Sequence, residues 1–150
     1  MVELSPVLIV TGPTASGKSA LALAAARKFD GAVINADSMQ VYKELNILSA
    51  RPSEEDMARA PHSLFGVLAA ASACSAGRWL RMARLEIEAA WAQGRLPIVA
   101  GGTGLYLKAL TQGLAPVPDI PGNVRQFVRA IYENLGAEGL RQKLSFLDPR

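Results

Sequence analysis

Cysteine and long apolar runs are scarce in this 150-residue sequence, and each scarcity excludes a class of protein. Cys74 is the only cysteine, so an intrachain disulfide is impossible. No apolar run approaches the roughly 20 residues that a helix needs to cross a bilayer, so we expect no membrane partner. The first residues, which include Glu3, lack the basic start of a signal peptide. We therefore expect a cytoplasmic protein.

The composition is that of a globular chain with a mild excess of basic residues. Half of the residues are hydrophobic and 19% are charged, which is outside the range typical of disordered chains. The net charge of +3 suits a polyanionic partner such as a nucleic acid. Charge alone does not demonstrate such a partner, because many small basic proteins bind no nucleic acid.

Apolar runs and helical periodicity predict alternating strands and helices. The longest predicted helix, 75–93, has an apolar stripe at helical spacing and ends at Gly94. The stripe consists of Ala76, Trp79, Leu80, Ala83, Ile87 and Ala90. Buried strands are predicted at 7–10, 32–35, 64–68 and 96–100, and further helices at 19–28 and 105–110.

This alternation is typical of an α/β fold with a mainly parallel sheet flanked by helices. Three polar segments, 12–19, 37–38 and 101–104, each follow a predicted strand. Ligands of such sheets bind beyond the carboxyl ends of the strands. We therefore expect a doubly wound, P-loop NTPase-like core in which Lys18, Asp37 and Thr103 surround one cavity.

The sequence changes character after Leu114, which predicts a boundary between a core at 1–114 and a second region at 115–150. Residues 115–122 contain three prolines and a glycine, and we interpret them as a crossover. Apolar residues at i, i+3, i+4 and i+7 then predict an amphipathic helix at 124–135, followed by a shorter helix at 137–146. The apolar face of the first helix needs a partner, so we expect the chain to self-associate.

A phosphate-binding loop is the strongest single motif. Residues 12–19 match G-x-x-x-x-G-K-[ST] at every required position, between a predicted strand and a predicted helix. The expected phosphate-binding residues are Gly12, Pro13, Thr14, Ala15, Ser16, Gly17, Lys18 and Ser19. Backbone N–H groups and the Lys18 ammonium would hold phosphate, and the Ser19 hydroxyl would hold Mg²⁺. The alternative is a chance glycine turn. The loop indicates a diphosphate or triphosphate without indicating the reaction.

Asp37 follows the second predicted strand, across the sheet end from the loop. A carboxylate there can hold magnesium through water or accept a proton from an attacking group. It can also simply cap a helix, since aspartate favours that position. The local sequence leaves these three interpretations open.

Six further matches make the sequence similar to one enzyme family, the tRNA dimethylallyltransferases, over nearly the whole chain. The phosphate loop has the family's Gly-Pro-Thr-Ala-Ser-Gly-Lys form. The other matches, in order, are Asp37-Ser38-Met39-Gln40-Val41-Tyr42, Ser49-Ala50-Arg51-Pro52, Pro61-His62, Ser75-Ala76, Gly101-Gly102-Thr103-Gly104-Leu105-Tyr106 and Val124-Arg125. Ordered motifs at family spacing identify the chain as resembling the catalytic-core portion of such an enzyme.

The resemblance implies transfer of a dimethylallyl group from dimethylallyl diphosphate to the N6 amine of an adenosine next to the tRNA anticodon. It implies that Asp37 is the general base and that Thr103 contacts the diphosphate and the reacting region. It also implies that tRNA is bound by Asp37, Ser38, Met39, Gln40, Thr103 and Arg125, with 115–150 as the start of a helical tRNA-binding region. Mg²⁺ is the implied cofactor, held at Ser19, and full-length members are expected to be monomeric.

Some features depart from the family pattern. Cys74 stands where the family often has an aromatic residue, residues 69–73 lack the usual Asp-Pro, and Ser49 replaces a threonine. His62 matches a family position, and we expect a structural hydrogen bond from it. Family members are about twice this length. Three alternatives remain: an adenylate isopentenyltransferase that uses a free nucleotide, a small-molecule P-loop kinase, and a fragment that binds diphosphate or RNA without catalysis.

Overall fold

The computed structural model describes residues 5–45, 47–115 and 120–149, in two compact units that divide after Leu114. Each unit is described by itself. The predicted crossover at 115–122 lies partly outside the described residues, because 116–119 are not among them. Whether the first unit is a catalytic core and the second the start of a tRNA-binding region stays a prediction.

The first unit contains a four-stranded parallel sheet in the order β1-β4-β2-β3. The strands are β1 (Leu8–Val10), β2 (Gly31–Asn35), β3 (His62–Ser63) and β4 (Leu96–Ala100). The helices are α1 (Lys18–Lys28), α2 (Glu54–Arg59), α3 (Ala76–Ala92) and α4 (Gly104–Gln112), with a 3₁₀ turn at Lys43–Leu45. The predicted α/β fold with a parallel sheet is confirmed.

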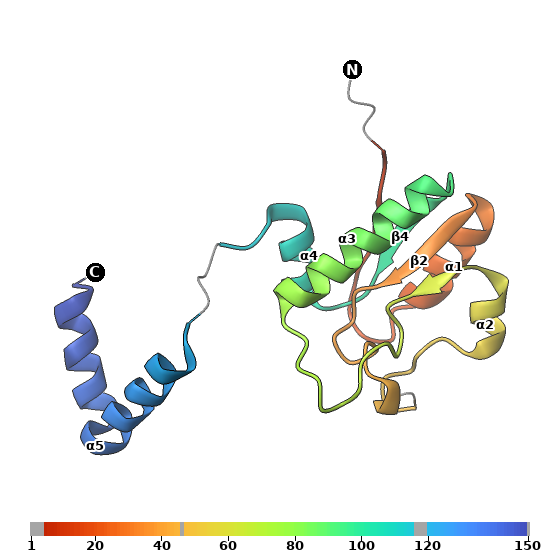
Figure 1. Ribbon diagram of the computed structural model, residues 1–150. Helices are drawn as coiled ribbons and strands as arrows, with labels where there is room; N and C mark the ends of the chain where they lie inside the picture. The colour runs from red at the N-terminus through yellow and green to blue at the C-terminus, as the bar shows by residue number, and fades with distance from the viewer. Residues whose placement is uncertain (1–4, 46, 116–119, 150) are drawn as a thin grey trace. The chain divides into compact units, whose positions relative to one another are not determined.

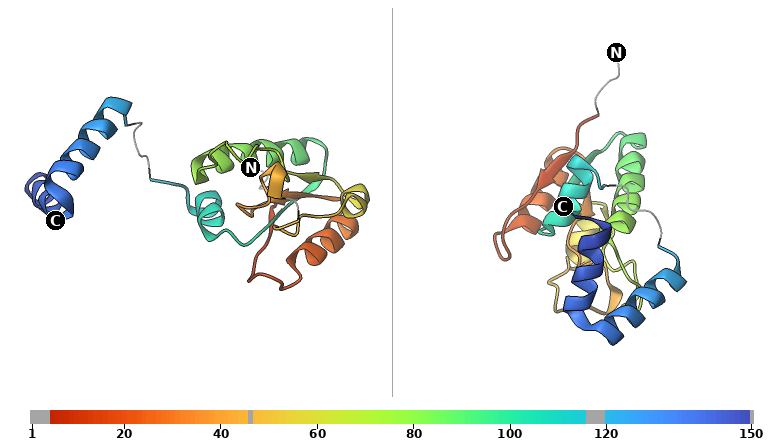
Figure 2. Two further views of the ribbon diagram at one scale, coloured as in Figure 1. Left: turned by 90° about the horizontal axis from the view of Figure 1, so that it is seen from below. Right: turned by 90° about the vertical axis from the view of Figure 1, so that its left-hand side faces the viewer.

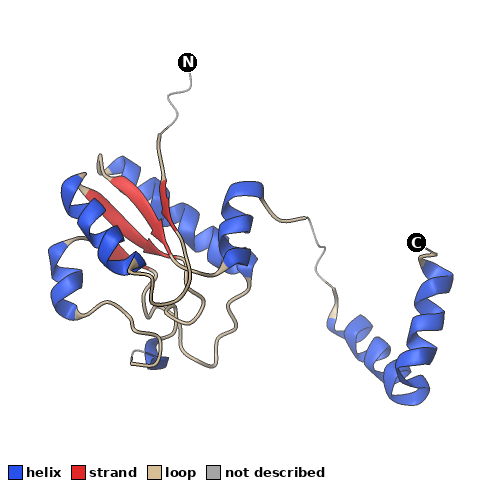
Figure 3. Ribbon diagram, turned by 180° about the vertical axis from the view of Figure 1, so that it is seen from behind, coloured by secondary structure: helices blue, strands red, loops and turns tan. Residues whose placement is uncertain are grey.

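Helices cover both faces of the sheet, because successive strand residues point to opposite sides. Val33 and Ile98 pack with α1 on one face, whereas Ile34 and Val99 pack with α3 and α4 on the other. Figures 2 and 3 show the strands between α1 and α3. The segments that leave β1 and β4 therefore run to opposite faces, which is the arrangement that opens a ligand crevice between neighbouring strand ends.

The predicted strand at 64–68 is wrong. The third strand is instead the two-residue β3, and it ends where Leu64 adopts a left-handed φ of 63°. Leu64 and Leu68 are buried, as their apolar character suggested, but Leu64 lies in a bend and Leu68 forms only an isolated parallel bridge with Tyr42. The backbone N–H groups of Gly66 and Leu68 donate to the carbonyls of Gln40 and Val41, at 2.8 and 2.9 Å. The apolar run therefore predicted burial correctly but overestimated the extent of strand pairing.

The second unit consists of α5 (Gly122–Leu147), which is interrupted at Gly136 with a φ of 65°. It corresponds to the two predicted helices (Figure 1). Its apolar residues Val124, Phe127 and Tyr132 are 42 to 65% exposed, and none of the described residues of α5 is buried. Self-association through this face stays a prediction. In the described parts of the chain, no helix combines the length and apolarity needed to span a membrane.

Candidate active site

The phosphate loop curls between β1 and α1. Gly17 immediately precedes α1 with a φ of 81°, a conformation that only glycine adopts without strain. Ala15 has a φ of 61°, so the loop also holds a non-glycine residue in the left-handed region. The Lys18 ammonium donates a hydrogen bond to the Pro13 carbonyl across the loop. The free N–H groups at the start of α1 can therefore converge on an anion.

A cavity of about 650 Å³ lies against this loop. Residues 14–19 form one wall, and the loop after β2 contributes Asp37 and Gln40. Residues 49–52 and 100–102 also line the cavity. The structure thus brings Lys18 and Asp37 to one cavity, together with Ser19, whereas Thr103, the third residue expected there, is not among the lining residues.

Several other predicted site residues do not line this cavity. Gly12, Pro13, Ser38, Met39 and Thr103 are not among the residues that line the cavity. Arg125 belongs to the second unit. Thr103 is nevertheless tied to the site, because its Oγ1 accepts a hydrogen bond of 2.9 Å from the Ser38 N–H.

Asp37 lies in a turn and caps no α-helix. Its Oδ1 accepts a hydrogen bond of 2.9 Å from the Met39 N–H, which fixes the rotation of the carboxylate. Residues 38–41 form turns, and Tyr42 then pairs with Leu68 in an isolated parallel bridge before the 3₁₀ segment at Lys43. No described residue bonds to Oδ2, so this oxygen is available to a ligand or to a proton.

Asn35 and Trp79 support this turn, and neither was predicted from the sequence to be a site residue. The Asn35 side chain is fully buried and bonds to both backbone polar groups of Asp37. Trp79 Nε1 donates to the Asn35 carbonyl at 2.8 Å, and the Trp79 ring stacks on Tyr106 at 4.5 Å. The available signal was an asparagine at the end of an apolar strand, two residues before an aspartate, the spacing of an Asx turn.

Tyr106, which stacks on Trp79, also contacts the half-exposed Cys74. Its hydroxyl lies 3.4 Å from the Cys74 Sγ. Burial, and then the neighbouring thiol, raise the pKa of the Tyr106 hydroxyl above its ordinary value. The phenol therefore stays neutral, as its stacked and buried position requires.

A close backbone approach joins the Asp37 turn to the loop after β4. Ala36 donates to the Ala100 carbonyl at 2.8 Å and accepts from the Thr103 N–H at 3.2 Å. Gly101 lies so near that an added Cβ would sit 2.2 Å from the Ala36 carbonyl carbon. Only glycine fits there.

Replacing Gly101 by alanine is expected to lower the free energy of unfolding by at least about 3 kcal/mol, the upper end of ordinary overpacking costs. The Cβ would collide with backbone that is hydrogen-bonded on both sides and cannot move away. Gly102→Ala is the matched control, because its Cβ would meet the Gly12 oxygen at an ordinary 3.5 Å. Urea unfolding of both variants checks this, and equal losses would contradict it.

Gln40 connects the Asp37 turn to residues 49–52. Its Nε2 donates to the Ser49 carbonyl at 2.9 Å, and the Ser49 hydroxyl donates to the Leu45 carbonyl. The amide oxygen of Gln40 keeps its hydrogen-bonding capacity at the cavity wall. Ser49 stands where the family pattern named above usually has a threonine, and both residues carry a hydroxyl. In Ser49 this hydroxyl is used for the bond to the Leu45 carbonyl.

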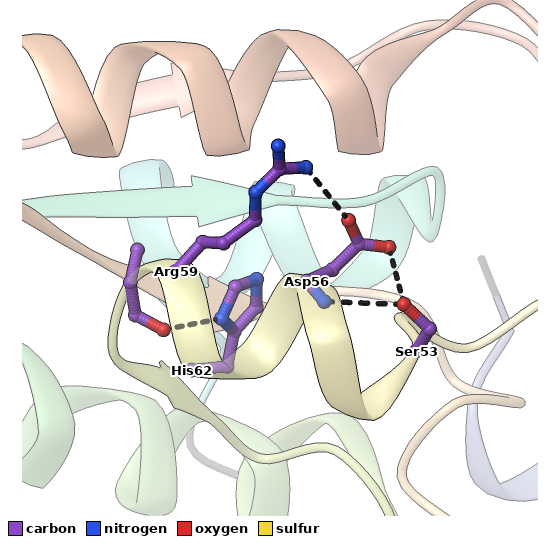
Figure 4. A network of polar contacts seen from close by, with 5 residues as sticks. Ser53, Asp56, Arg59 and His62 are labelled. Carbon is purple, nitrogen blue, oxygen red and sulfur yellow. Dashed lines mark hydrogen bonds and ion pairs between the residues drawn. The ribbon is translucent and has the colours of Figure 1, made fainter.

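Asp56 and Arg59 of α2 and His62 of β3 also line this cavity. Figure 4 shows the polar contacts that these residues make with their neighbours. Ser53 caps α2 by accepting a hydrogen bond from the Asp56 N–H, and Arg59 pairs loosely with Asp56 at 3.8 Å. The Nδ1 of His62 lies 2.8 Å from the Ala60 carbonyl, and its ring meets Phe65 edge-on at 5.6 Å. His62 therefore makes the structural hydrogen bond that was expected, at the edge of the cavity.

Two family models match the chain. The model described as IPP transferase matches residues 40–150, and the model described as Isopentenyl transferase matches residues 5–62. The first model therefore covers well over half of the chain. The phosphate loop lies in the region of the second model alone, whereas both models include Gln40.

Similar proteins include two curated tRNA dimethylallyltransferases. The one from Rhodospirillum rubrum is 59% identical over 144 residues, which are 96% of this chain and 44% of the relative. The one from Hyphomonas neptunium is 52% identical over 146 residues, covering 97% of this chain and 46% of the relative. The chain thus spans about half the length of the curated relatives it matches.

Two solved structures share the fold. A full-length tRNA isopentenylpyrophosphate transferase from Bacillus halodurans has a TM-score of 0.73 at 31% identity, with 97% of this chain and 48% of that chain covered. A eukaryotic dimethylallyltransferase acting on tRNA has a TM-score of 0.80 at 28% identity, with 95% and 36% covered. The similarity therefore extends over nearly all of this chain.

Proposed function

The chain belongs to the IPP transferase family, and on that premise we propose that the whole protein transfers a dimethylallyl group from dimethylallyl diphosphate to the N6 amine of an adenosine next to the tRNA anticodon. The observation that carries the proposal is the single cavity lined by both Lys18 and Asp37. A phosphate-binding loop and a carboxylate with a free oxygen there supply the two groups that the reaction requires. A tRNA substrate is consistent with the expected cytoplasmic location.

The phosphate loop would hold the leaving group. In this reaction the bond between C1 of the allylic chain and the diphosphate oxygen breaks, and the electron pair goes to the diphosphate. Lys18 and the N–H groups at the start of α1 stabilise the charge that develops there. The Thr103 hydroxyl, whose oxygen already accepts from Ser38, keeps its hydrogen for the diphosphate.

Asp37 would act on the acceptor. The N6 nitrogen forms the new bond to C1 and must lose a proton, because the exocyclic amine is only weakly basic. The Oδ2 of Asp37 takes that proton, while Oδ1 remains held by the Met39 N–H. The carboxylate is thus held in one orientation before the acceptor binds, and Oδ2 makes no hydrogen bond to a described residue.

The tRNA must present its adenine outside the base stack, since the amine is inaccessible within it. Gln40 lines the cavity and offers its amide oxygen, and Met39 is 51% exposed beside Asp37. These residues, with Ser38, would seat the extruded base. Arg125 on α5 would contact the tRNA backbone, as a guanidinium suits phosphate.

Magnesium fits this cavity as an ion shared with the substrate. Within the described residues, no three histidine, cysteine or acidic side chains gather as metal ligands. Mg²⁺ is commonly held by one or two protein groups together with water and substrate phosphates. The Ser19 hydroxyl would be one such group. An Asp37 carboxylate that holds the ion through water is the alternative to its role as the base. When bound, the ion offsets negative charge on the diphosphate.

An adenylate acceptor is the second candidate, because the model described as Isopentenyl transferase matches residues 5–62. That segment contains the loop and Asp37, which either acceptor would use. The match over residues 40–150 to the IPP transferase model and the relatives named for tRNA favour the polynucleotide. We therefore expect tRNA to be used in preference to a free nucleotide.

Labelled dimethylallyl diphosphate offered to tRNA, AMP or water separates these functions. The chain is tested alone and as a hybrid protein, in which it replaces the matching segment of the Rhodospirillum rubrum relative. We expect label on tRNA from the hybrid protein. Label on AMP would identify the adenylate enzyme, and diphosphate binding without transfer would identify a binding protein. Transfer by the relative but not by a folded hybrid protein would contradict the proposal.

A further inference from the structure

Asn35 is the one polar side chain in the buried core of the described residues, with no exposed surface. It is the last residue of β2. A buried amide costs free energy unless its hydrogen bonds are made, so its presence in an apolar layer calls for a reason. Both ends of this amide are bonded. Its Oδ1 accepts from the Asp37 N–H at 2.8 Å, and its Nδ2 donates to the Asp37 and Leu64 carbonyls at 3.0 and 3.1 Å.

One side chain therefore holds both backbone polar groups of Asp37. Two Asx turns follow one another. Asn35 Oδ1 accepts a hydrogen bond from the Asp37 N–H, and Asp37 Oδ1 accepts one from the Met39 N–H. The first turn fixes the backbone that bears the carboxylate, and the second fixes the carboxylate itself. The rotation of Asp37 is thus set from inside the core.

The main chain of Asn35 is fixed as well. Its carbonyl accepts a hydrogen bond of 2.8 Å from Trp79 Nε1, and Trp79 is fully buried. The stacked Tyr106 ring holds that indole in place. The main chain of Asn35 is therefore anchored by α3, the helix that packs on this face of the sheet.

We propose that Asn35 is a positioning residue for Asp37, which orients the carboxylate toward the extruded adenine amine. The inference rests on the proposed function, in which Asp37 accepts the proton. A purely structural asparagine would matter only for stability. A positioning asparagine acts on turnover, and it acts through Asp37 alone.

Kinetics of the hybrid protein separate these roles. Asn35→Ala is expected to lower kcat by about 100-fold with little change in KM, because a displacement of about 1 Å has costs of that order. Asn35→Ser should recover much of this loss, since a serine hydroxyl can accept from the N–H two residues on, although more weakly. Ile87→Ala, a core truncation in α3, controls for lost stability and should keep kcat.

A double-mutant cycle tests the route of the effect. In an Asp37→Asn background, Asn35→Ala should cause no further loss, because the group it positions is already removed. An equal loss in both backgrounds would overturn the proposal, as would a wild-type kcat in Asn35→Ala. A loss in Ile87→Ala as large as in Asn35→Ala would also overturn it.

Hydrogen exchange of the Asp37 N–H in the chain itself is a readout independent of transfer. The amide should be protected in the wild-type and Ile87→Ala chains and should exchange at least 10-fold faster in Asn35→Ala. Unchanged protection in Asn35→Ala would refute the positioning role. A hybrid protein without transfer activity, combined with the expected exchange, would count against the proposed function and leave the hold of Asn35 on Asp37 intact.

Discussion

Replacing Asp37 by asparagine is expected to slow dimethylallyl transfer by the hybrid protein about 100- to 10,000-fold, the usual worth of a general base. Asparagine keeps the size of the side chain and an oxygen for the Met39 N–H, so the turn survives. It loses the oxygen that accepts the proton. Binding of diphosphate and of tRNA should change little. Single-turnover transfer and calorimetry measure the two effects separately.

Asp56→Asn is the matched control, because Asp56 is a carboxylate of the same cavity that pairs with Arg59 and takes no part in the proposed chemistry. It should transfer at nearly the wild-type rate. The magnesium interpretation of Asp37 makes another forecast: Asp37→Asn would weaken diphosphate binding, and added Mg²⁺ would partly restore it. An Asp37→Asn protein that transfers at the unmutated rate would eliminate the general base.

Replacing Lys18 by alanine is expected to weaken diphosphate binding by roughly 10- to 150-fold. A hydrogen bond to a charged group is worth about 1.5–3 kcal/mol, and 1.4 kcal/mol is a factor of ten. The fold should remain, because the Pro13 carbonyl of an exposed loop is the only group among the described residues to which the ammonium bonds. Calorimetry with inorganic diphosphate and circular dichroism of the chain check both statements.

Lys28→Ala is the control for this variant. It removes the same charge from the last turn of the same helix, where the ammonium lies 5.4 Å from the centre of the Phe29 ring. Its diphosphate affinity should stay within about threefold of the wild type, since about 15 Å of helix separates Lys28 from Lys18, more than the screening length of roughly 8 Å at physiological salt. Equal losses in the two variants would mean that net charge, and not the loop, governs binding.

The elements that follow local rules were predictable from the sequence. The apolar run at 96–100 is β4 to the residue, and the apolar stripe of 75–93 is the buried face of α3. The phosphate loop lies between a strand and a helix as its motif demanded. In each case the residues that determine the structure are neighbours in the sequence.

Long-range contacts were not predictable in this way. The bond from the Ser38 N–H to Thr103 joins residues 65 apart, and the bond from Trp79 to Asn35 joins residues 44 apart. Nothing in the local sequence shows that β4 lies between β1 and β2, which is what brings these partners together. The strand prediction at 64–68 was wrong for the same reason, because the burial of these apolar residues depends on distant contacts, of which only the bridge between Leu68 and Tyr42 resembles strand pairing.

The most direct test of the account is mass spectrometry of tRNA after reaction with the hybrid protein and dimethylallyl diphosphate. We predict a dimethylallyl group on the N6 nitrogen of the adenosine beside the anticodon with the wild-type and Asp56→Asn proteins. Over the same interval, little or none is expected with Asp37→Asn or Lys18→Ala. Unmodified tRNA from a folded, diphosphate-binding wild-type hybrid protein, under conditions in which the Rhodospirillum rubrum relative modifies it, would contradict the account.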